Sequence, residues 1–436
     1  MRDREIKNRD MSRWNVLRFM LDPRFRRDPY PLYARLREWA PVHTAVVGAT
    51  IISSHAAVME ALRHPHMSNS ESHADFSYAA GRRGAGQLAE APFRYLMNRG
   101  GGWQDEPRDA FIAMSRNFLT GIDAPHHTRL RGLVARAFTP RVIADATPVI
   151  EKIAHELIDQ LEPRRSADLL SEYAYELPVR VICRMLGVPA EDFPVFHRWV
   201  VDIVARFDLA GLGSTRIARD SNTATKELTA YLLALADNRR AEPRDDLISR
   251  LVELADDGDA LSEPELVSVV ALLLAAGHET TANLIGTSAW HLSQNPGQLS
   301  DWKQHPDLRR NGVEELLRFD SSIQLMQRIT TEACEIGGVE IARGRHVIML
   351  LGAANRDPER FSDPDRLDLG RPGVQAISFG FGAHHCIGAA LARAEGEIGL
   401  GVLYDRLPNL RPTVERPEWR PSIVFRGLKE LPVRWD

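Results

Sequence analysis

A single cysteine in a glycine-rich loop is the residue of this chain best placed for chemistry. Residues 379–388 read Phe-Gly-Phe-Gly-Ala-His-His-Cys-Ile-Gly, and a helical pattern begins directly behind them. Glycines let a backbone run close to a flat cofactor, and N–H groups of a loop and a helix start can hold a sulfur as its anion. Such a thiolate suits the axial position of a haem iron, where it favours O–O bond cleavage. The alternative for a lone Cys386 is a buried, inert small hydrophobe.

The surrounding pattern decides between these two interpretations of Cys386. The sequence Phe-Gly-x-Gly-x-His-x-Cys-x-Gly resembles the haem-binding signature of the cytochrome P450 family and matches it at every fixed position. The resemblance implies that Cys386 ligates the iron of haem b, that Phe379 packs beside the sulfur, and that His384 and Gly388 belong to the cofactor site. It also implies dioxygen as a co-substrate.

A long helix is predicted over residues 262–293, and its middle is interrupted by small and polar residues. Ser262 and Glu265 form a capping box that starts the helix. Further along the helix, residues 276–280 read Ala-Gly-His-Glu-Thr, and the small Ala276 and Gly277 leave space on the helix surface. Thr280 can donate to the carbonyl of Ala276 and open the helix locally. This stretch resembles the family's oxygen-activation motif. By that resemblance, Thr280 steadies bound dioxygen and Glu279 relays protons. The alternative is a core helix with a few satisfied polar residues.

A Glu-x-x-Arg pair places Glu315 and Arg318 one helical turn apart, where they can form an ion pair. Taken alone, the spacing fits a surface pair of little energetic value. It also resembles the family's structural brace, whose third member is an arginine from the segment before the cysteine loop. That resemblance assigns the third position to Arg371 and a role in folding and haem loading.

A haem carries two propionates, and buried charge is costly unless it is paired. Resemblance to the family's Asp-x-Pro-x-His-x-x-x-Arg segment implies that His127 and Arg131 contact these groups. Arg328 and His384 match two further contacts. The alternative for the basic helix near residue 130 is a solvated face.

Composition limits the class of protein. The chain has 436 residues and a formal net charge of −4, which argues against a nucleic-acid partner. Its cysteines are few and far apart, so Cys183 and Cys334 are expected to be structural and the compartment reducing. The N-terminus has no apolar core, and the apolar run at 266–276 is shorter than the ~20 residues that span a bilayer. We therefore expect no membrane anchor and a cytoplasmic location.

Helical patterns dominate, so the predicted fold is mostly α with a small β portion, in one domain over 1–436. The family resemblance implies an α-rich prism with the long central helix over the haem and the ligand loop with its following helix over 372–396. Glycine-rich residues 66–122 are expected to form a long substrate-side loop. Short strands are predicted near 423–425 and 431–433.

The substrate is expected to be a mid-sized hydrophobic small molecule. Candidate pocket residues are Ala276, Ile323, Leu325, Ile423 and Val424.

Electrons are expected to come from NAD(P)H through a separate reductase and a ferredoxin or flavodoxin. Arg129, Arg136 and Arg141 are the candidate docking residues for such an acidic partner. We expect a monomer.

The resemblance thus implies a haem-thiolate monooxygenase that hydroxylates or epoxidises its substrate. A peroxide-driven peroxygenase is the first alternative, although such enzymes often replace the acid–alcohol pair that Glu279 and Thr280 supply. A haem-thiolate ligand-binding or sensing protein is the second, and a cysteine hydrolase centred on Cys386 is the third.

Overall fold

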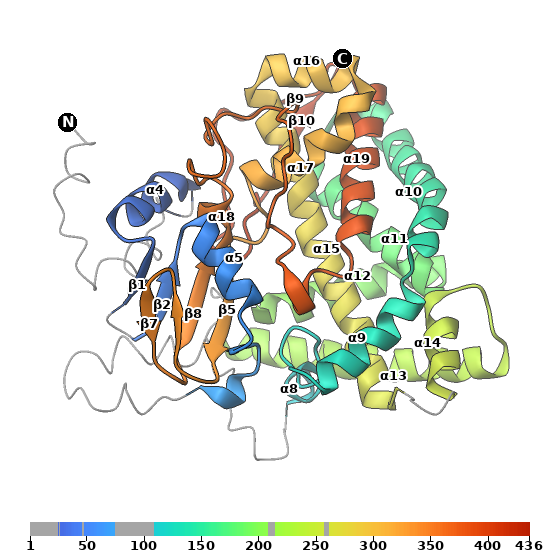
Figure 1. Cartoon of the computed structure of the whole chain (residues 1–436). Coiled ribbons are helices and arrows are strands. Elements are labelled where there is room, and N and C mark those ends of the chain that lie inside the picture. The colour runs from blue at the N-terminus through green and yellow to red at the C-terminus, as the bar shows by residue number, and fades with distance from the viewer. Residues whose placement is uncertain (1–24, 26, 46–47, 75–108, 208–213, 257–260) are drawn as a thin grey trace.

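The computed structural model describes residue 25 and residues 27–45, 48–74, 109–207, 214–256 and 261–436. Helices make up most of it (Figure 1). The α-helices are α4 (Tyr30–Trp39), α5 (His55–Arg63), α8 (Ala110–Ser115), α9 (His126–Ala137), α10 (Pro140–Leu161), α11 (Glu176–Leu186), α12 (Phe193–Val204), α13 (Thr215–Ala241), α14 (Leu247–Asp256), α15 (Glu263–Gln294), α16 (Pro296–Gln304), α17 (Arg309–Phe319), α18 (Leu351–Ala354) and α19 (Ala389–Arg406).

The strands form three small sheets. The five-stranded sheet has the order β1-β2-β8-β5-β3, in which β2 and β8 are parallel and the other neighbours antiparallel. A three-stranded sheet has the order β4-β10-β9, and β6 pairs with β7. The strands are β1 (Val42–Thr44), β2 (Thr50–Ile52), β3 (Met67–Ser68), β4 (Ser166–Asp168), β5 (Leu325–Thr330), β6 (Cys334–Ile336), β7 (Val339–Ile341), β8 (His346–Leu350), β9 (Arg411–Pro412) and β10 (Pro432–Arg434).

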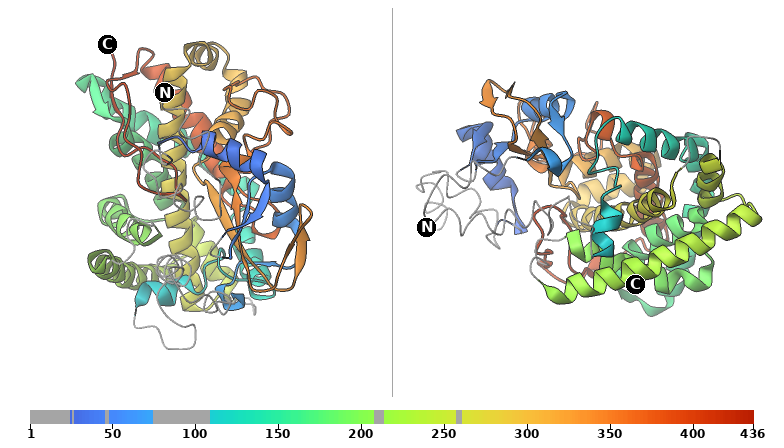
Figure 2. Two further views of the ribbon diagram at one scale, coloured as in Figure 1. Left: turned by 90° about the vertical axis from the view of Figure 1, so that its left-hand side faces the viewer. Right: turned by 90° about the horizontal axis from the view of Figure 1, so that it is seen from below.

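Alternating side chains bury both faces of the larger sheet. Ile51 and Ile348 pack with Tyr33 and Leu36 of α4, whereas the next residues along the strands pack with α5. Both views of Figure 2 keep this sheet on one side of the molecule and the green helices α10–α14 on the other. The fold is therefore mostly α with a small β portion, as the sequence predicts.

Helix α15 runs through the middle of the molecule between these two sides (Figure 1). It begins with the predicted capping box, in which the Ser262 N–H donates to Glu265 Oε2 at 2.9 Å. Among the described residues it is the one helix long and apolar enough to cross a membrane, yet 72% of its apolar window is buried inside the protein. It is therefore the core helix that its apolar surface requires.

Two minor elements differ in part from those that the sequence predicts. Residues 423–425 form no strand, because only one bridge, between Ile323 and Phe425, pairs this segment. The predicted long loop at 66–122 contains β3, a short turn at Glu71–His73 and α8, while its part at 75–108 lies outside the described residues.

One buried carboxylate joins four distant parts of the chain. Asp320, just after α17, is 2% exposed. Its oxygens accept from Tyr30 Oη at 2.7 Å and Arg426 Nε at 2.5 Å, and hydrogen-bond His291 Nε2 at 2.7 Å. Burial alone would raise the pKa of Asp320, but the Arg426 guanidinium and His291 outweigh it and hold the pKa well below its usual range. The carboxylate is thus charged and fixes α4, α15 and the C-terminal segment to α17.

We predict that Asp320→Asn lowers the free energy of unfolding by about 3–5 kcal/mol, because it leaves the buried Arg426 charge without its counter-ion. Urea titration followed by circular dichroism measures this loss. Asp307→Asn, at an exposed aspartate, is the control and should change stability by less than about 0.5 kcal/mol. Equal effects of the two substitutions would contradict this role of Asp320.

Candidate functional site

The loop that carries Cys386 has a tightly constrained backbone. Gly380 and Gly382 have φ values of 68° and 75°, which only glycine adopts without strain. A Cβ at Gly380 would lie 3.0 Å from the Met326 methyl group. The Cys386 N–H donates to Phe379 O at 2.9 Å. The loop thereby presents an exposed Cys386 just before α19 begins.

Although Cys386 is exposed, many protein atoms surround its sulfur. This burial raises the pKa of the Cys386 thiol, while the Gly388 N–H and the guanidinium groups of Arg131 and Arg393 act to lower it. A coordinated metal cation deprotonates a thiol outright. The N–H and both guanidinium groups are therefore placed to stabilise the sulfur anion that such a metal would require.

Basic side chains from three segments meet beside this loop. The rings of His127 and His384 stack with centroids 3.8 Å apart. Arg131, on the same helix as His127, donates from Nη2 to His385 O at 2.6 Å. Arg328, on β5, is 8% exposed and acts electrostatically on both histidines. The structure thus brings together the four side chains that the sequence assigns to the propionates.

The electrostatics of this basic cluster (His127, Arg131, Arg328 and His384) call for an anion. Burial, followed by the neighbouring His127 and Arg328, lowers the pKa of His384 to about 3, and burial lowers that of Arg328 to about 10. His127 Nε2 is buried and has no hydrogen-bond partner among the described residues. Unpaired buried donors and crowded positive charge are costly. The cluster therefore fits the two carboxylates of a haem.

The middle of α15 has an open notch. Thr280 Oγ1 donates to Ala276 O at 2.7 Å, as the sequence predicts. Ala276 is exposed, and a Cβ added to Gly277 would meet no described atom within 4 Å. The helix consequently has space and a hydroxyl group at this turn.

One segment connects the notch to the cysteine loop. Ser322 Oγ donates to Thr280 O at 2.8 Å, and Ser321 Oγ lies 2.7 Å from Ser378 Oγ, one residue before the loop. The Met326 side chain occupies the space beside Gly380 where a Cβ would stand. Thr280 and the cysteine loop are therefore both held by residues 321–326.

Close packing also joins α15 to α19. A Cβ added to Gly396 would lie 3.0 Å from Leu284 Cδ2, and one added to Gly399 would lie 3.4 Å from Ile285 Cδ1. The absence of side chains at these glycines lets the two helices meet. The helix with the notch thus lies directly against the helix that follows the cysteine.

Glu279 is held in a polar network that the sequence did not reveal. Its Oε1 atom pairs with Arg420 Nη1 and accepts from Tyr175 Oη at 3.4 Å and Asn283 Nδ2 at 3.3 Å. Arg420 also donates to Tyr175 Oη at 2.7 Å. Tyr175 and Arg420 are far from Glu279 in sequence, so no spacing pattern could identify them.

The predicted brace residues form a buried triad. Arg318 donates to both oxygens of Glu315, at 2.6 and 2.9 Å, and Arg371 Nε lies 3.1 Å from each. Both guanidinium groups also donate to backbone carbonyls of residues 355–366. The triad therefore fixes the segment that leads to the cysteine loop.

The candidate substrate residues Ile323, Leu325, Ile423 and Val424 are each partly buried. They come from two segments that the backbone joins, because the Gln324 N–H donates to Val424 O at 2.9 Å. The structure thus gathers them near the segment that holds Thr280.

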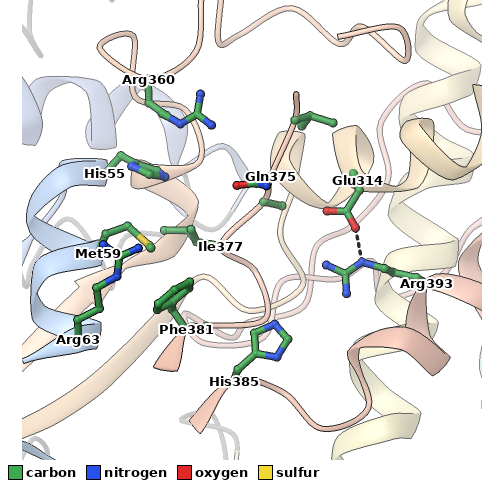
Figure 3. Close-up of a pocket in the computed structure, with 13 residues that line it drawn as sticks. His55, Met59, Arg63, Glu314, Arg360, Gln375, Ile377, Phe381, His385 and Arg393 are labelled. Carbon is green, nitrogen blue, oxygen red and sulfur yellow. Dashed lines mark hydrogen bonds and ion pairs between the residues drawn. The ribbon is translucent and has the colours of Figure 1, made fainter. Parts of the chain in front are cut away.

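A hollow of about 560 Å³ lies beside the cysteine loop and is lined by residues of this loop and of α5 (Figure 3). Arg63, Arg360 and Arg393 line it together with Phe381, which is 39% exposed. Arg393 pairs with Glu314, as the dashed line in Figure 3 marks. This basic surface of the loop differs from the one expected from the sequence.

The arginines expected to dock a redox partner are not among the residues that line this hollow. Arg129 pairs with Glu265, which also contacts His126 at 3.0 Å, so Arg129 serves to hold α9 against α15. Arg136 and Arg141 are exposed.

We predict that Arg371→Gln destabilises the fold by about 3–5 kcal/mol, since it leaves buried charge in the brace without a partner. Urea titration measures the loss, and the ratio of haem to protein absorbance should fall with it. Arg411→Gln is a matched control, because Arg411 also contacts both oxygens of a carboxylate, Asp436, but at the surface. It should leave the midpoint of the urea transition close to that of the wild type. A brace variant as stable as the control would refute the prediction.

Comparisons with known proteins agree with this geometry. The family model described as "Cytochrome P450" matches residues 114–301 and 307–407. Cytochrome P450 107B1 of Saccharopolyspora erythraea is 38% identical over 95% of this chain and 96% of its own length. The vitamin D(3) 25-hydroxylase of Pseudonocardia autotrophica is 37% identical over 94% of each.

A solved structure of P450BioI in complex with an acyl carrier protein ligated to hexadec-9Z-enoic acid aligns with a TM-score of 0.83. It is 30% identical in sequence, over 95% of this chain and 99% of that one. With its cysteine loop, basic cluster and notched central helix, this chain belongs to the cytochrome P450 family and is a P450 monooxygenase of the soluble bacterial type.

Proposed function

We propose that this monooxygenase hydroxylates or epoxidises a mid-sized hydrophobic small molecule, and that Cys386 would hold the iron of haem b. The observation that carries the proposal is the attachment of Thr280 and the Cys386 loop to the same segment, with the basic cluster beside the loop. A bound haem would supply the activation of dioxygen. Residues of the chain would hold the cofactor, deliver protons and contact the substrate.

The cofactor site has separate holding and tuning groups. Cys386 would bind the iron, and the Gly388 N–H would stabilise its sulfur. The ring of Phe379 has its centroid 4.5 Å from Arg393 Cζ. This ring would pack beside the sulfur. The basic cluster would pair with the propionates, since it combines positive charge with an unpaired ring nitrogen.

Glu279 and Thr280 would deliver protons to the dioxygen co-substrate. Thr280 would offer its hydroxyl at the notch, and Glu279 would carry protons to it from solvent. For this, the Glu279 carboxylate would have to exchange its contacts with Arg420 and Tyr175 for contacts nearer Thr280. The notch leaves space for the small ligand.

Apolar side chains favour a hydrophobic substrate. Ala276, Ile323, Leu325, Ile423 and Val424 would contact it, with polar groups confined to the turn of Thr280. The similarity to a vitamin D(3) 25-hydroxylase supports a substrate of this class.

Electrons would come from NAD(P)H through a reductase and a ferredoxin or flavodoxin that binds the hollow in Figure 3. Arginines around an exposed phenylalanine suit an acidic protein partner, and the hollow adjoins the Cys386 loop. We propose a cytoplasmic monomer. The P450BioI structure contains an acyl carrier protein, so a carrier-bound substrate is a further form to test.

The same cofactor site would also serve a peroxide-driven peroxygenase. The presence of both Glu279 and Thr280 favours the dioxygen route, since a peroxygenase needs no delivery of protons to dioxygen. A ligand sensor without turnover would not need the pair either.

We predict that the wild type binds haem and gives the carbon-monoxide difference spectrum of a thiolate-ligated iron, and that Cys386→Ser abolishes this spectrum. The reason is that a neutral hydroxyl group replaces the electron-donating sulfur. Cys334→Ser is the control, because Cys334 lies in β6, outside the loop. An unchanged spectrum for Cys386→Ser would end the proposal.

Turnover separates the remaining functions. A library of hydrophobic compounds is first screened for the change in haem spin state, and each compound that binds is offered with NADPH, ferredoxin and reductase or with hydrogen peroxide. Product with the first mixture supports the monooxygenase, while product with peroxide alone identifies a peroxygenase. Binding without product in either mixture identifies a sensor.

We also predict that Arg63→Glu and Arg360→Glu each slow ferredoxin-dependent reduction about tenfold at low salt, because they reverse charge at the docking hollow. Stopped-flow reduction at increasing ionic strength measures the rate and its salt dependence. Arg219→Glu, at an exposed arginine on α13, should leave both unchanged. Normal reduction of the two hollow variants would place the docking surface elsewhere.

A further inference from the structure

A histidine in the centre of the protein has both ring nitrogens unpaired. His278, next to Glu279 on α15, is 1% exposed. Neither Nδ1 nor Nε2 has a hydrogen-bond partner among the described residues. A buried polar group of this kind is costly unless ordered water or a functional partner satisfies it. His278 therefore requires an explanation that the apolar core does not give.

A second histidine continues from His278 toward the surface. His197, on α12, packs edge-on against the His278 ring, with centroids 5.6 Å apart. Its side chain is 35% exposed, and Nδ1 lies 4.0 Å from Glu176 Oε1. Its Nδ1 likewise has no hydrogen-bond partner among the described residues. The two rings thus form a line from the partly exposed His197 to the buried His278, and three of their nitrogens have no hydrogen-bond partner among the described residues.

The inner end of this line reaches the Glu279 network. The Tyr175 ring lies 5.2 Å from the His278 ring, measured between centroids, and its hydroxyl group contacts Glu279 Oε1 at 3.4 Å. The hydrogen bonds and the ion pair described for Glu279 all involve Oε1. Its other oxygen is left for a further donor.

We propose that His197 and His278 form the proton inlet to Glu279, with ordered water beside the packed rings bridging their nitrogens. The inference rests on the proposed function, because Glu279 needs a supply of protons only if it delivers them. In each transfer one ring nitrogen accepts a proton while the other releases one, so each imidazole ends with as many protons as it had. Solvent supplies the proton, Glu279 receives it, and no oxidant or reductant is consumed.

The surroundings of His278 suit a neutral relay. Burial, then His197 and Arg420, lower the pKa of His278 to about 3, so the ring does not store a positive charge. A neutral imidazole has one donor and one acceptor nitrogen, which is the arrangement that a concerted transfer through water needs. The Arg420 guanidinium holds the Glu279 carboxylate at the end of this line.

The alternative is that the two imidazole rings only fill space. Substituting each histidine by phenylalanine tests this alternative. His197→Phe and His278→Phe keep an aromatic ring and remove the nitrogens. His305→Phe, at an exposed histidine beside α16, is the matched control. Haem content and the carbon-monoxide spectrum should be the same in all forms.

The first measurement needs no known substrate. Oxidation of NADPH by the holoenzyme with ferredoxin and reductase is followed in H₂O and D₂O. We expect His278→Phe to slow oxidation about tenfold, less than the full contribution of a positioned acid–base group because water can partly replace the ring. The solvent isotope effect should rise in both variants and stay unchanged in the control. Wild-type rates and isotope effects in both variants would overturn the inlet.

The second measurement does not use turnover. Histidine is labelled with ¹⁵N in the carbon-monoxide-bound ferrous protein, and His278→Phe assigns the ring signal by its disappearance. Exchange of the His278 ring proton with water should be readily detected and be lost in His197→Phe. Exchange that is undiminished in His197→Phe would overturn the inlet.

The two experiments also separate this inference from the function on which it rests. His197 is partly exposed, so His197→Phe remains a usable variant if His278→Phe does not fold. A wild type without haem or turnover would refute the proposed function and, with it, a need for an inlet. A functional wild type whose histidine variants behave like the control would refute the inlet alone.

Discussion

Positive charge that lacks an adequate counter-ion is the constraint on which this structure depends. Arg131 and Arg328 carry this charge beside the Cys386 loop, next to His127 and His384, whose pKa values burial and the neighbouring cations lower; Asp123 is the one carboxylate whose charge acts on this cluster among the described groups. This arrangement has a cost in an apolar interior unless an anion joins it. A dianionic cofactor removes that cost, so haem binding and the stability of this region are coupled.

Elsewhere in the core, buried carboxylates have charged and hydrogen-bonding partners. Glu315 is satisfied by two arginines, and Asp320 by a tyrosine, a histidine and an arginine. Removing one partner of such a buried pair leaves an uncompensated charge, which is strongly destabilising. The paired carboxylates Glu315 and Asp320 therefore fix the surrounding segments, whereas the basic cluster has charge available for a bound anion.

Local sequence patterns predicted the parts of the site that lie close together in the chain. The cysteine loop, the capping box at Ser262 and the hydrogen bond from Thr280 to Ala276 each depend on a few neighbouring residues. Residues 423–425 were wrongly predicted as a strand, because an apolar run does not reveal whether a neighbouring strand continues beside it. The Arg420–Glu279 pair and the basic hollow depend on tertiary packing, which no spacing in one sequence encodes.

The glycines of α19 bear on attempts to change which substrates the protein accepts. A Cβ at Gly399 would come within 2.8 Å of Leu177 Cδ2, and one at Gly396 within 3.0 Å of Leu284. Any bulk added there would push α19, and the sulfur at its start, away from α15. The spacing of α15 and α19 is therefore set by residues that have no side chain at their contact. Attempts to change the proposed substrate preference should leave these glycines intact and vary Ile323 and Ile423, which lie outside both helices.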